Sequence, residues 1–298
     1  MTEREHGPKA QLAERGLHAK KHFGQNFLTD PSLARRIAEL ASTPPGGTVV
    51  ELGAGLGALT GPLLERAAHA VAIERDRDLI PMLEARFART VAEGKLQIIE
   101  ADAKGIDPVE LCGAHPRPHV LAGNLPYNLT GPLLTLATSV AQRLERVVYL
   151  VQLEVADRVA ARPGTDAYGA LSVFVQAQFA PRRALVVRRG AFYPQPNVDS
   201  AVLVLEPLPT PVTAETEAFR AVVRAAFAQR RKKLTDAWRG VLGQSAAAVC
   251  AAAERARCRA VEHAAGRRRQ RGTHGAGGKR DLLRGRRQVR QRRHCRPR

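Results

Sequence analysis

Short apolar runs alternate with amphipathic stretches through the first half of the chain. Four runs have the length and the apolar content of buried strands, namely residues 48–52, 70–73, 96–99 and 119–123. The stretches 56–66 and 76–91 lie between them and have the apolar spacing of helices. Because alternating strands and helices form crossover units, the pattern predicts a parallel sheet with helices on both faces.

Further elements are predicted on both sides of this core. Asp30 and Pro31 are typical of a helix start, with aspartate as the N-cap and proline at the first helical position. The run 147–153 is predicted to continue the sheet, and the runs 183–187 and 200–205 to form a late antiparallel pair.

The positions of prolines and charges divide the chain into four segments. Prolines at positions 207, 209 and 211 mark a linker, and residues 215–227 and 234–242 beyond it are predicted helices. The predicted segments are a polar arm at 1–25, an α/β domain at 26–207, a small all-α domain at 208–254 and a basic tail at 255–298.

Charge changes this picture mainly at the C-terminus. The 298 residues carry a formal charge of +19, which is typical of a protein that binds nucleic acid. Residues 255–298 hold 17 arginines and lysines against two acidic residues, which leaves only +4 on the other 254 residues. This tail has too few large apolar side chains to fold alone. Two interpretations stay open: a disordered tail that binds RNA phosphates, or a frame-shifted or otherwise non-native terminus.

Composition also argues against several classes of protein. The first 21 residues are polar, and no apolar run approaches the roughly 20 residues that span a bilayer. We therefore expect a cytoplasmic protein with no membrane partner. The four cysteines include no C-x-x-C pair, which argues against a disulfide framework and a zinc finger. Prolines between His115 and His119 prevent the helix that would align them on a metal, so no metal site is expected.

A glycine-rich turn follows the first predicted strand. Residues 51–57 read ELGAGLG, which is G-x-G-x-G spacing after the acidic Glu51. Glycines at such a turn let the backbone approach a ligand closely. Dinucleotide-binding proteins have G-x-G-x-x-G at the same place, so the shorter spacing favours a cofactor that lacks a pyrophosphate.

Two carboxylates follow the next two predicted strands. Glu74 lies 21 residues beyond Gly53, near the interval of about 20 at which an acidic residue meets ribose hydroxyls. Asp102 is placed to accept a hydrogen bond from a cofactor adenine. A lone acid at a strand end is more often simply exposed to solvent. Ligands of parallel sheets, however, bind beyond the carboxyl ends of the strands, where all three residues would meet. Together they resemble the cofactor site of class I methyltransferases, rather than that of a dehydrogenase.

The fourth predicted strand ends in a loop with candidate catalytic residues. Residues 123–128 read GNLPYN, which is similar to the [ND]-P-P-[YF] loop of methyltransferases that act on planar amino groups. An exocyclic amine is a poor nucleophile because its lone pair is delocalised into the ring. The side-chain carbonyl of Asn124 and the backbone carbonyl of Leu125 can accept its N–H groups, while Pro126 stiffens the turn. Tyr127 offers a ring for stacking on an extruded base. The alternative is an ordinary strand–helix turn with a buried tyrosine.

Three further motifs make the resemblance more specific. Residues 21–28 (KHFGQNFL), 192–201 (FYPQPNVDSA) and 227–234 (FAQRRKKL) resemble, in this order, motifs of the ribosomal RNA adenine dimethylases. The resemblance implies a class I, Rossmann-like methyltransferase sheet with a small C-terminal all-α domain, and S-adenosylmethionine as the cofactor. It assigns the cofactor contacts to Asn26, Leu28, Gly53, Glu74, Asp102 and Asn124. It makes Phe192 a second aromatic residue of the base pocket, opposite Tyr127.

The housekeeping branch of that family is the one most resembled. It dimethylates two adjacent adenines near the 3′ end of small-subunit rRNA, so the expected partners are this rRNA and the precursor of the small subunit, bound by a monomer. One alternative is the branch that methylates large-subunit rRNA and confers macrolide resistance. Another is a non-catalytic ribosome-assembly factor on the same fold. The chain departs from the family after residues 246–253, where apolar helices are expected and an arginine-rich sequence follows.

Overall fold

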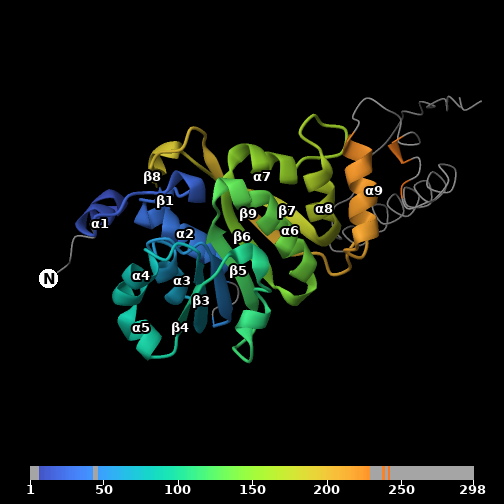
Figure 1. The fold of residues 1–298 in the computed structure, drawn as a ribbon. Coiled ribbons are helices and arrows are strands. Elements are labelled where there is room, and N and C mark those ends of the chain that lie inside the picture. The colour runs from blue at the N-terminus through green and yellow to red at the C-terminus, as the bar shows by residue number, and fades with distance from the viewer. Residues whose placement is uncertain (1–6, 43–45, 229–236, 239–240, 242–298) are drawn as a thin grey trace, which may run out of the picture. The chain divides into compact units, whose positions relative to one another are not determined.

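The computed structural model describes residues 7–42, 46–228, 237–238 and 241. Its centre is a seven-stranded sheet in the order β4-β3-β2-β5-β6-β9-β7 (Figure 1). The first five strands in this order run parallel, and β9 and β7 are antiparallel to their neighbours. The strands are β2 (Thr48–Leu52), β3 (His69–Glu74), β4 (Leu96–Glu100), β5 (His119–Asn124), β6 (Arg146–Gln152), β7 (Phe179–Val187) and β9 (Ser200–Pro207). The parallel sheet and the late antiparallel pair are both confirmed.

Helices pack on both faces of this sheet, as predicted. One face is covered by α2 (Pro31–Ala41), α3 (Thr60–Leu64) and α4 (Ile80–Arg86), which is followed by α5 (Ala88–Ala92). The other face is covered by α6 (Thr130–Val140), α7 (Leu153–Val159) and α8 (Ala170–Gln178). Successive strand residues point to opposite faces, so Val49 belongs to the first core and Val50 to the second.

The start of α2 is the one that the sequence predicts. Oδ1 of Asp30 accepts hydrogen bonds from the backbone N–H groups of Ser32 (2.8 Å) and Leu33 (3.2 Å), and Pro31 takes the first helical position. These bonds satisfy donors that have no partner within the first turn of a helix. The residues that follow on the apolar face, such as Ile37, are fully buried.

Two of the predicted helices are too long. The helix predicted at 56–66 begins only at Thr60, because Gly53, Gly55 and Gly57 have φ values of 78°, 59° and 80° and form a turn. The helix predicted at 76–91 begins only at Ile80, and a break at Phe87 separates α4 from α5. The residues 74–79 that precede α4 form a turn held by the side chains of Glu74 and Asp76.

The arm predicted at 1–25 contains a helix, α1 (Pro8–Glu14). Leu12 on this helix is 2% exposed and belongs to a small apolar cluster with Phe27, Leu56 and Leu79. The chain then enters β1 (Phe27–Leu28), which pairs with β8 (Phe192–Tyr193) in a separate two-stranded sheet. The predicted polar arm thus contains a helix with one buried apolar residue, Leu12.

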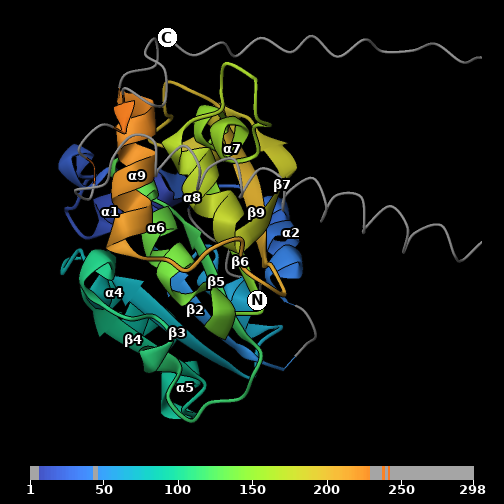
Figure 2. The same ribbon diagram turned by 90° about the vertical axis from the view of Figure 1, so that its right-hand side faces the viewer.

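The last long helix of the described residues is α9 (Glu217–Ala228), close to the helix predicted at 215–227. It lies beside α8, which lies beside α6 (Figure 2). Phe219 of α9 packs edge-on against Phe174 of α8, with ring centroids 5.8 Å apart. The predicted helix at 234–242 lies outside the described residues except for 237–238 and 241. About half of the predicted all-α domain at 208–254 and all of the tail at 255–298 lie outside them as well. In the described part of the chain, no helix is long and apolar enough to cross a membrane.

Candidate active site

A pocket lies where the parallel strands end. It is lined by the loops that follow β2, β3, β4 and β5 and by residues 23–28 of the N-terminal segment. The six residues predicted to bind a cofactor all line it: Asn26, Leu28, Gly53, Glu74, Asp102 and Asn124. Leu125 and Pro126 of the predicted catalytic loop line it as well. The structure therefore brings these residues, which lie far apart in the sequence, into one hollow.

The glycine-rich turn forms the floor of this pocket. The N–H groups of Gly53 and Ala54 both donate to the carbonyl oxygen of Ile73, at 2.8 and 3.1 Å. Gly55 has a positive φ, and a Cβ there would lie 3.2 Å from the ring of Phe27. Glycine is therefore required both for the conformation and for the close approach of residue 27.

Glu74 is held rigidly by backbone donors. Its Oε1 accepts from the N–H groups of Arg75 and Asp76 at 2.8 Å, and its Oε2 accepts from the N–H of Gly55 at 2.7 Å. Burial raises the pKa of Glu74, and these three hydrogen bonds oppose that rise. A carboxylate offers about four acceptor positions, so roughly one remains free, on Oε2. Glu74 therefore keeps an acceptor position on one of its two oxygens, and its contact with ribose hydroxyls stays a prediction.

Glu51 is a pocket residue that was not among the predicted site residues. It is 2% exposed, and the hydroxyl of Thr60 donates to its Oε2 at 2.5 Å. Burial raises the pKa of Glu51 to about 8, and the neighbouring carboxyl of Glu74 adds to the rise. Among the described residues none donates a hydrogen bond to Oε1. The signal in the sequence is a glutamate inside an otherwise apolar strand, directly before the glycine turn.

Asp102 stands at the rim of the pocket, with its side chain 34% exposed. Its Oδ1 accepts from the backbone N–H of Lys104 at 3.1 Å. Its Oδ2 lies 3.4 Å from Nη1 of Arg75 and 3.6 Å from Nζ of Lys104. The carboxylate thus keeps acceptor positions while two cations balance its charge.

The end of β5 presents an amide to the pocket. Nδ2 of Asn124 donates to the backbone oxygen of Asn26 at 2.7 Å, which turns Oδ1 of Asn124 away from that residue. No donor to Oδ1 is found in the described part of the chain. Leu125 is 1% exposed, and its N–H donates to the carbonyl oxygen of Leu150 at 3.1 Å. The loop is thereby anchored to β6 while the Asn124 carbonyl remains available to a ligand.

The two predicted stacking residues lie apart from the pocket lining. Tyr127 is half-buried, and its hydroxyl lies 2.7 Å from Oγ of Ser200. Burial raises the pKa of Tyr127, which keeps the hydroxyl protonated. Phe192 is 4% exposed, pairs with Leu28 between β8 and β1, and belongs to the core on the α2 face. Its role as the second aromatic residue of a base pocket stays a prediction.

Comparison with known proteins gives consistent matches. The model of the family described as Ribosomal RNA adenine dimethylase matches residues 16–252. A protein from Geobacter sulfurreducens named Ribosomal RNA small subunit methyltransferase A is 42% identical over 228 residues, which are 76% of this chain and 82% of the relative. A protein of the same name from Aromatoleum aromaticum is 44% identical over 76% of this chain and 83% of its own length.

Two solved structures are similar to the described fold. A dimethyladenosine transferase from Plasmodium falciparum superposes with a TM-score of 0.61 at 27% identity, over 71% of this chain and 74% of that chain. The 23S rRNA methyltransferase ErmE superposes with a TM-score of 0.55, also at 27% identity, over 71% of this chain and 83% of that chain.

Proposed function

Because this chain belongs to the ribosomal RNA adenine dimethylase family, we propose that it dimethylates N6 of two adjacent adenines near the 3′ end of small-subunit rRNA. The proposal rests on one observation: a single pocket is lined by the Asn124 amide, the glycine turn and the acids Glu51, Glu74 and Asp102. The enzyme is a ribosomal RNA adenine dimethyltransferase, and its family uses S-adenosylmethionine.

The chemistry of the pocket fits this cofactor. S-adenosylmethionine supplies an electrophilic methyl group on a positively charged sulfonium. The glycine turn leaves room for close approach, and Glu74 offers an acceptor to a ribose hydroxyl. Asp102 offers an acceptor to an adenine amine, and Leu28 an apolar wall. Glu51 can ionise beside a cation, which would lower its raised pKa.

The loop after β5 supplies the acceptors for the target amine. Oδ1 of Asn124 and the backbone carbonyl of Leu125 hold the N–H groups of the adenine, so that the nitrogen lone pair is directed at the methyl group. Pro126 stiffens this turn, and Tyr127 and Phe192 contact the base. Orientation carries the catalysis, because methyl transfer from a sulfonium is intrinsically favourable and the proton can leave to water afterwards.

The remaining segments have proposed roles in binding rRNA and the precursor of the small subunit. Residues 26–207 form the catalytic domain, which residues 1–25 precede. Residues 208–254 are proposed to form a small all-α domain. This segment and the basic tail at 255–298 are both proposed to contact RNA phosphates. The protein is proposed to act as a monomer in the cytoplasm, where its proposed ribosomal substrate lies.

One alternative is favoured by a specific observation. The similarity to the 23S rRNA methyltransferase ErmE supports a large-subunit substrate. The relatives at 42% and 44% identity carry the small-subunit name and cover more than three quarters of this chain, so the small subunit is preferred.

The test offers both substrates to one preparation of the protein. Purified protein is incubated with labelled S-adenosylmethionine and either undermethylated small subunits or protein-free large-subunit RNA, and modified bases are mapped by reverse-transcription stops. We expect label only on the small subunit, at two adjacent adenines near the 3′ end. Label on the large-subunit RNA would favour the alternative, and label on neither would contradict the proposed function.

A further inference from the structure

Residues 20–28, which we call the strap, form the N-terminal wall of the cofactor pocket. Six consecutive residues of the strap, 23–28, line this pocket. The strap has little regular structure of its own, namely one short 3₁₀ turn (Lys21–Phe23) and the two residues of β1. It must therefore be held in place chiefly by contacts with other parts of the chain.

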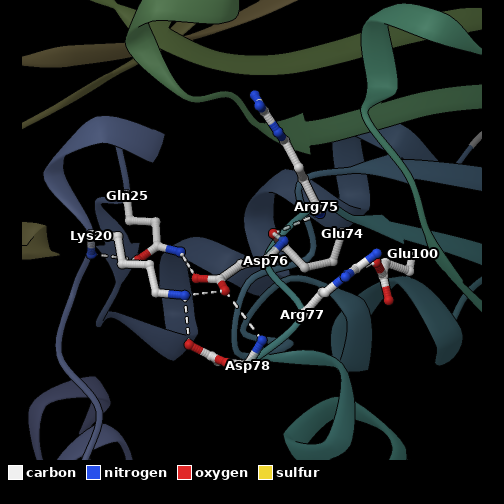
Figure 3. Close-up of polar contacts among 8 residues, drawn as sticks. All are labelled: Lys20, Gln25, Glu74, Arg75, Asp76, Arg77, Asp78 and Glu100. Carbon is white, nitrogen blue, oxygen red and sulfur yellow. Dashed lines mark hydrogen bonds and ion pairs between the residues drawn. The ribbon is translucent and has the colours of Figure 1, made fainter.

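A buried carboxylate in the turn after β3 makes several of those contacts (Figure 3). Nζ of Lys20 lies 2.5 Å from Oδ1 of Asp76 and 2.6 Å from Oδ2 of Asp78. Nε2 of Gln25 donates to Oδ2 of Asp76 at 2.7 Å, and Oε1 of Gln25 accepts from the backbone N–H of Lys20 at 2.7 Å. Two strap residues thus share one carboxylate, and they also bond to each other.

Asp76 belongs at the same time to the cofactor site. Its backbone N–H donates to Oε1 of Glu74 at 2.8 Å, and its side chain is only 3% exposed. The ring of Phe23 in the strap lies 5.2 Å from the guanidinium of Arg75 and 5.5 Å from Nζ of Lys20. The turn that orients Glu74 is therefore the turn to which the strap is attached.

The other end of the strap reaches the catalytic loop. The backbone oxygen of Asn26 accepts the hydrogen bond that orients the side chain of Asn124. Gln25, whose amide is bound to Asp76, is the residue directly before Asn26. A connected path therefore runs from Asp76 through a hydrogen bond to Gln25, along the backbone to Asn26, and through a second hydrogen bond to the side-chain amide of Asn124.

We propose that Asp76 is a positioning residue: it latches the strap over the bound cofactor, and through the strap it fixes the orientation of Asn124. This inference rests on the proposed function of the pocket. Loss of the latch weakens cofactor binding because the strap wall is released. It also slows transfer at saturating cofactor, because the Asn26 carbonyl no longer holds the Asn124 amide in one orientation.

The test compares Asp76→Ala with Arg77→Ala in the full-length protein. Arg77 is the next residue in the same turn, with a side chain that is 84% exposed and an ion pair to Glu100 outside the latch (Figure 3). Affinity for S-adenosylhomocysteine is measured by calorimetry, transfer is measured on undermethylated small subunits, and hydrogen exchange is followed across residues 20–28.

For Asp76→Ala we expect the dissociation constant to rise at least tenfold and kcat to fall at least threefold. We also expect the amides of the strap to exchange faster while those of β2 and β3 stay protected. For Arg77→Ala we expect all three values to stay within twofold of the wild type. A purely structural role for Asp76 would lower the melting temperature but leave the affinity and kcat of the folded protein unchanged.

A second pair of variants tests the latch from the strap side. Lys20→Met removes the cation, and Lys20→Arg retains it, so Lys20→Met is expected to weaken binding severalfold and Lys20→Arg to restore it. If Asp76→Ala does not fold, this pair decides the question. Wild-type affinity and kcat in both Asp76→Ala and Lys20→Met, or in Lys20→Met alone if Asp76→Ala does not fold, would overturn the latch. A wild-type protein that binds no S-adenosylhomocysteine would instead contradict the proposed function of the pocket.

Discussion

The two halves of the sheet differ in the sign of the charged side chains that mark them. The half built on β4, β3 and β2 carries carboxylates at its ligand edge, which we call the acidic half: Glu51, Glu74, Asp76 and Asp102. The half built on β6, β9 and β7 carries arginines on its edge strand and the turn that follows, which we call the arginine half: Arg182, Arg183, Arg188 and Arg189. This division matches a cationic methyl donor on one side and an anionic RNA on the other.

The halves differ in burial as much as in sign. Glu51, Glu74 and Asp76 are buried and receive hydrogen bonds from backbone or neighbouring side chains. Arg188, by contrast, is 85% exposed and has one carboxylate partner, Asp199. A small ligand that must be aligned for reaction needs rigid groups, whereas a long polyanion is attracted by exposed charges that salt screens.

A short motif connects the arginine half to the catalytic loop. Oδ1 of Asp199 accepts from the backbone N–H of Arg189 at 3.0 Å, and its Oδ2 accepts from Nη1 of Arg188 at 2.8 Å. The next residue, Ser200, is fully buried and holds the hydroxyl of Tyr127. The motif at residues 192–201 thus positions an arginine-bearing turn and an aromatic ring together.

Asn124 on the central strand belongs to neither half, and its removal should have the largest effect. For Asn124→Ala we expect methyl transfer at saturating cofactor to fall about 10²–10³-fold, because an acceptor aimed at the reacting amine is lost. Cofactor affinity should fall by less than about tenfold, the equivalent of one hydrogen bond. Calorimetry and a labelled-methyl assay measure the two effects separately. Equal losses in both would mean that Asn124 serves the cofactor rather than the amine.

Tyr127 tests whether the loop after β5, which Ser200 joins to the arginine half, presents an aromatic ring to the base. For Tyr127→Ala we expect kcat/KM for the small subunit to fall roughly 10–100-fold, the range of one lost base–aromatic stack. Tyr127→Phe keeps the ring and loses only the bond to Ser200, so its loss should stay below about fivefold. Cofactor affinity should be unchanged in both. If the phenylalanine variant were as impaired as the alanine variant, the hydroxyl rather than the ring would be the functional group.

The pH dependence of cofactor affinity tests the role of Glu51 in the acidic half. Burial raises the pKa of Glu51 to about 8, so below pH 8 the free protein holds a proton that must leave when a cation binds beside it. Affinity for S-adenosylmethionine should therefore fall, by up to about tenfold per pH unit, as the pH drops below 8. Glu51→Gln should flatten this dependence, which calorimetry between pH 6 and 9 can measure.

The same variant should stabilise the free protein at high pH. The folded pKa of Glu51 lies above its unfolded value of 4.5, so the group costs stability progressively as pH rises from 4.5 towards 8. Glu51→Gln should raise the free energy of unfolding by roughly 2–4 kcal/mol at pH 9, while Thr60 keeps its acceptor. Denaturant unfolding at pH 5 and pH 9 is the measurement. An equal change at both pH values would contradict the raised pKa.

The parallel sheet and the pocket at its edge were predictable because their signals are local. Each strand is a short apolar run, and its last residue or the loop directly after it carries Gly53, Glu74, Asp102 or Asn124. Once the strands are parallel, their carboxyl ends must meet. The lengths of the helices after β2 and β3 were wrong because apolar spacing does not report the positive φ of the glycine turn or the polar turn at 74–79.

The strap and its latch could not be predicted, because their signal is not local. Lys20 and Gln25 reach Asp76 across 56 and 51 positions of sequence, and no periodicity relates residues so far apart.

The helix α6 was also missed, since its buried positions include threonines and small residues and produce no clear amphipathic stripe. The place of Phe192 in a base pocket stays a prediction, and its burial depends on the pairing of β8 with β1, which only the folded chain reveals.

Arg182 should give the smallest effect and the sharpest contrast between the halves. It is exposed on β7, the edge strand, and it forms no ion pair with the other residues that the structure describes. For Arg182→Ala we expect KM for the small subunit to rise about twofold to fivefold at 0.1 M salt. The slope of log affinity against log salt should fall by roughly 0.7–0.9, the value of one phosphate contact.

Cofactor affinity should not change in Arg182→Ala, because this charge lies outside the acidic half that binds the cofactor. Arg89→Ala is the matched control, since Arg89 is 92% exposed on α5 beside β4, the opposite edge strand, and its removal changes net charge equally. If both variants shifted the salt slope alike, net charge rather than a defined RNA-binding edge would explain the attraction, and the division between the two halves would lose its functional meaning.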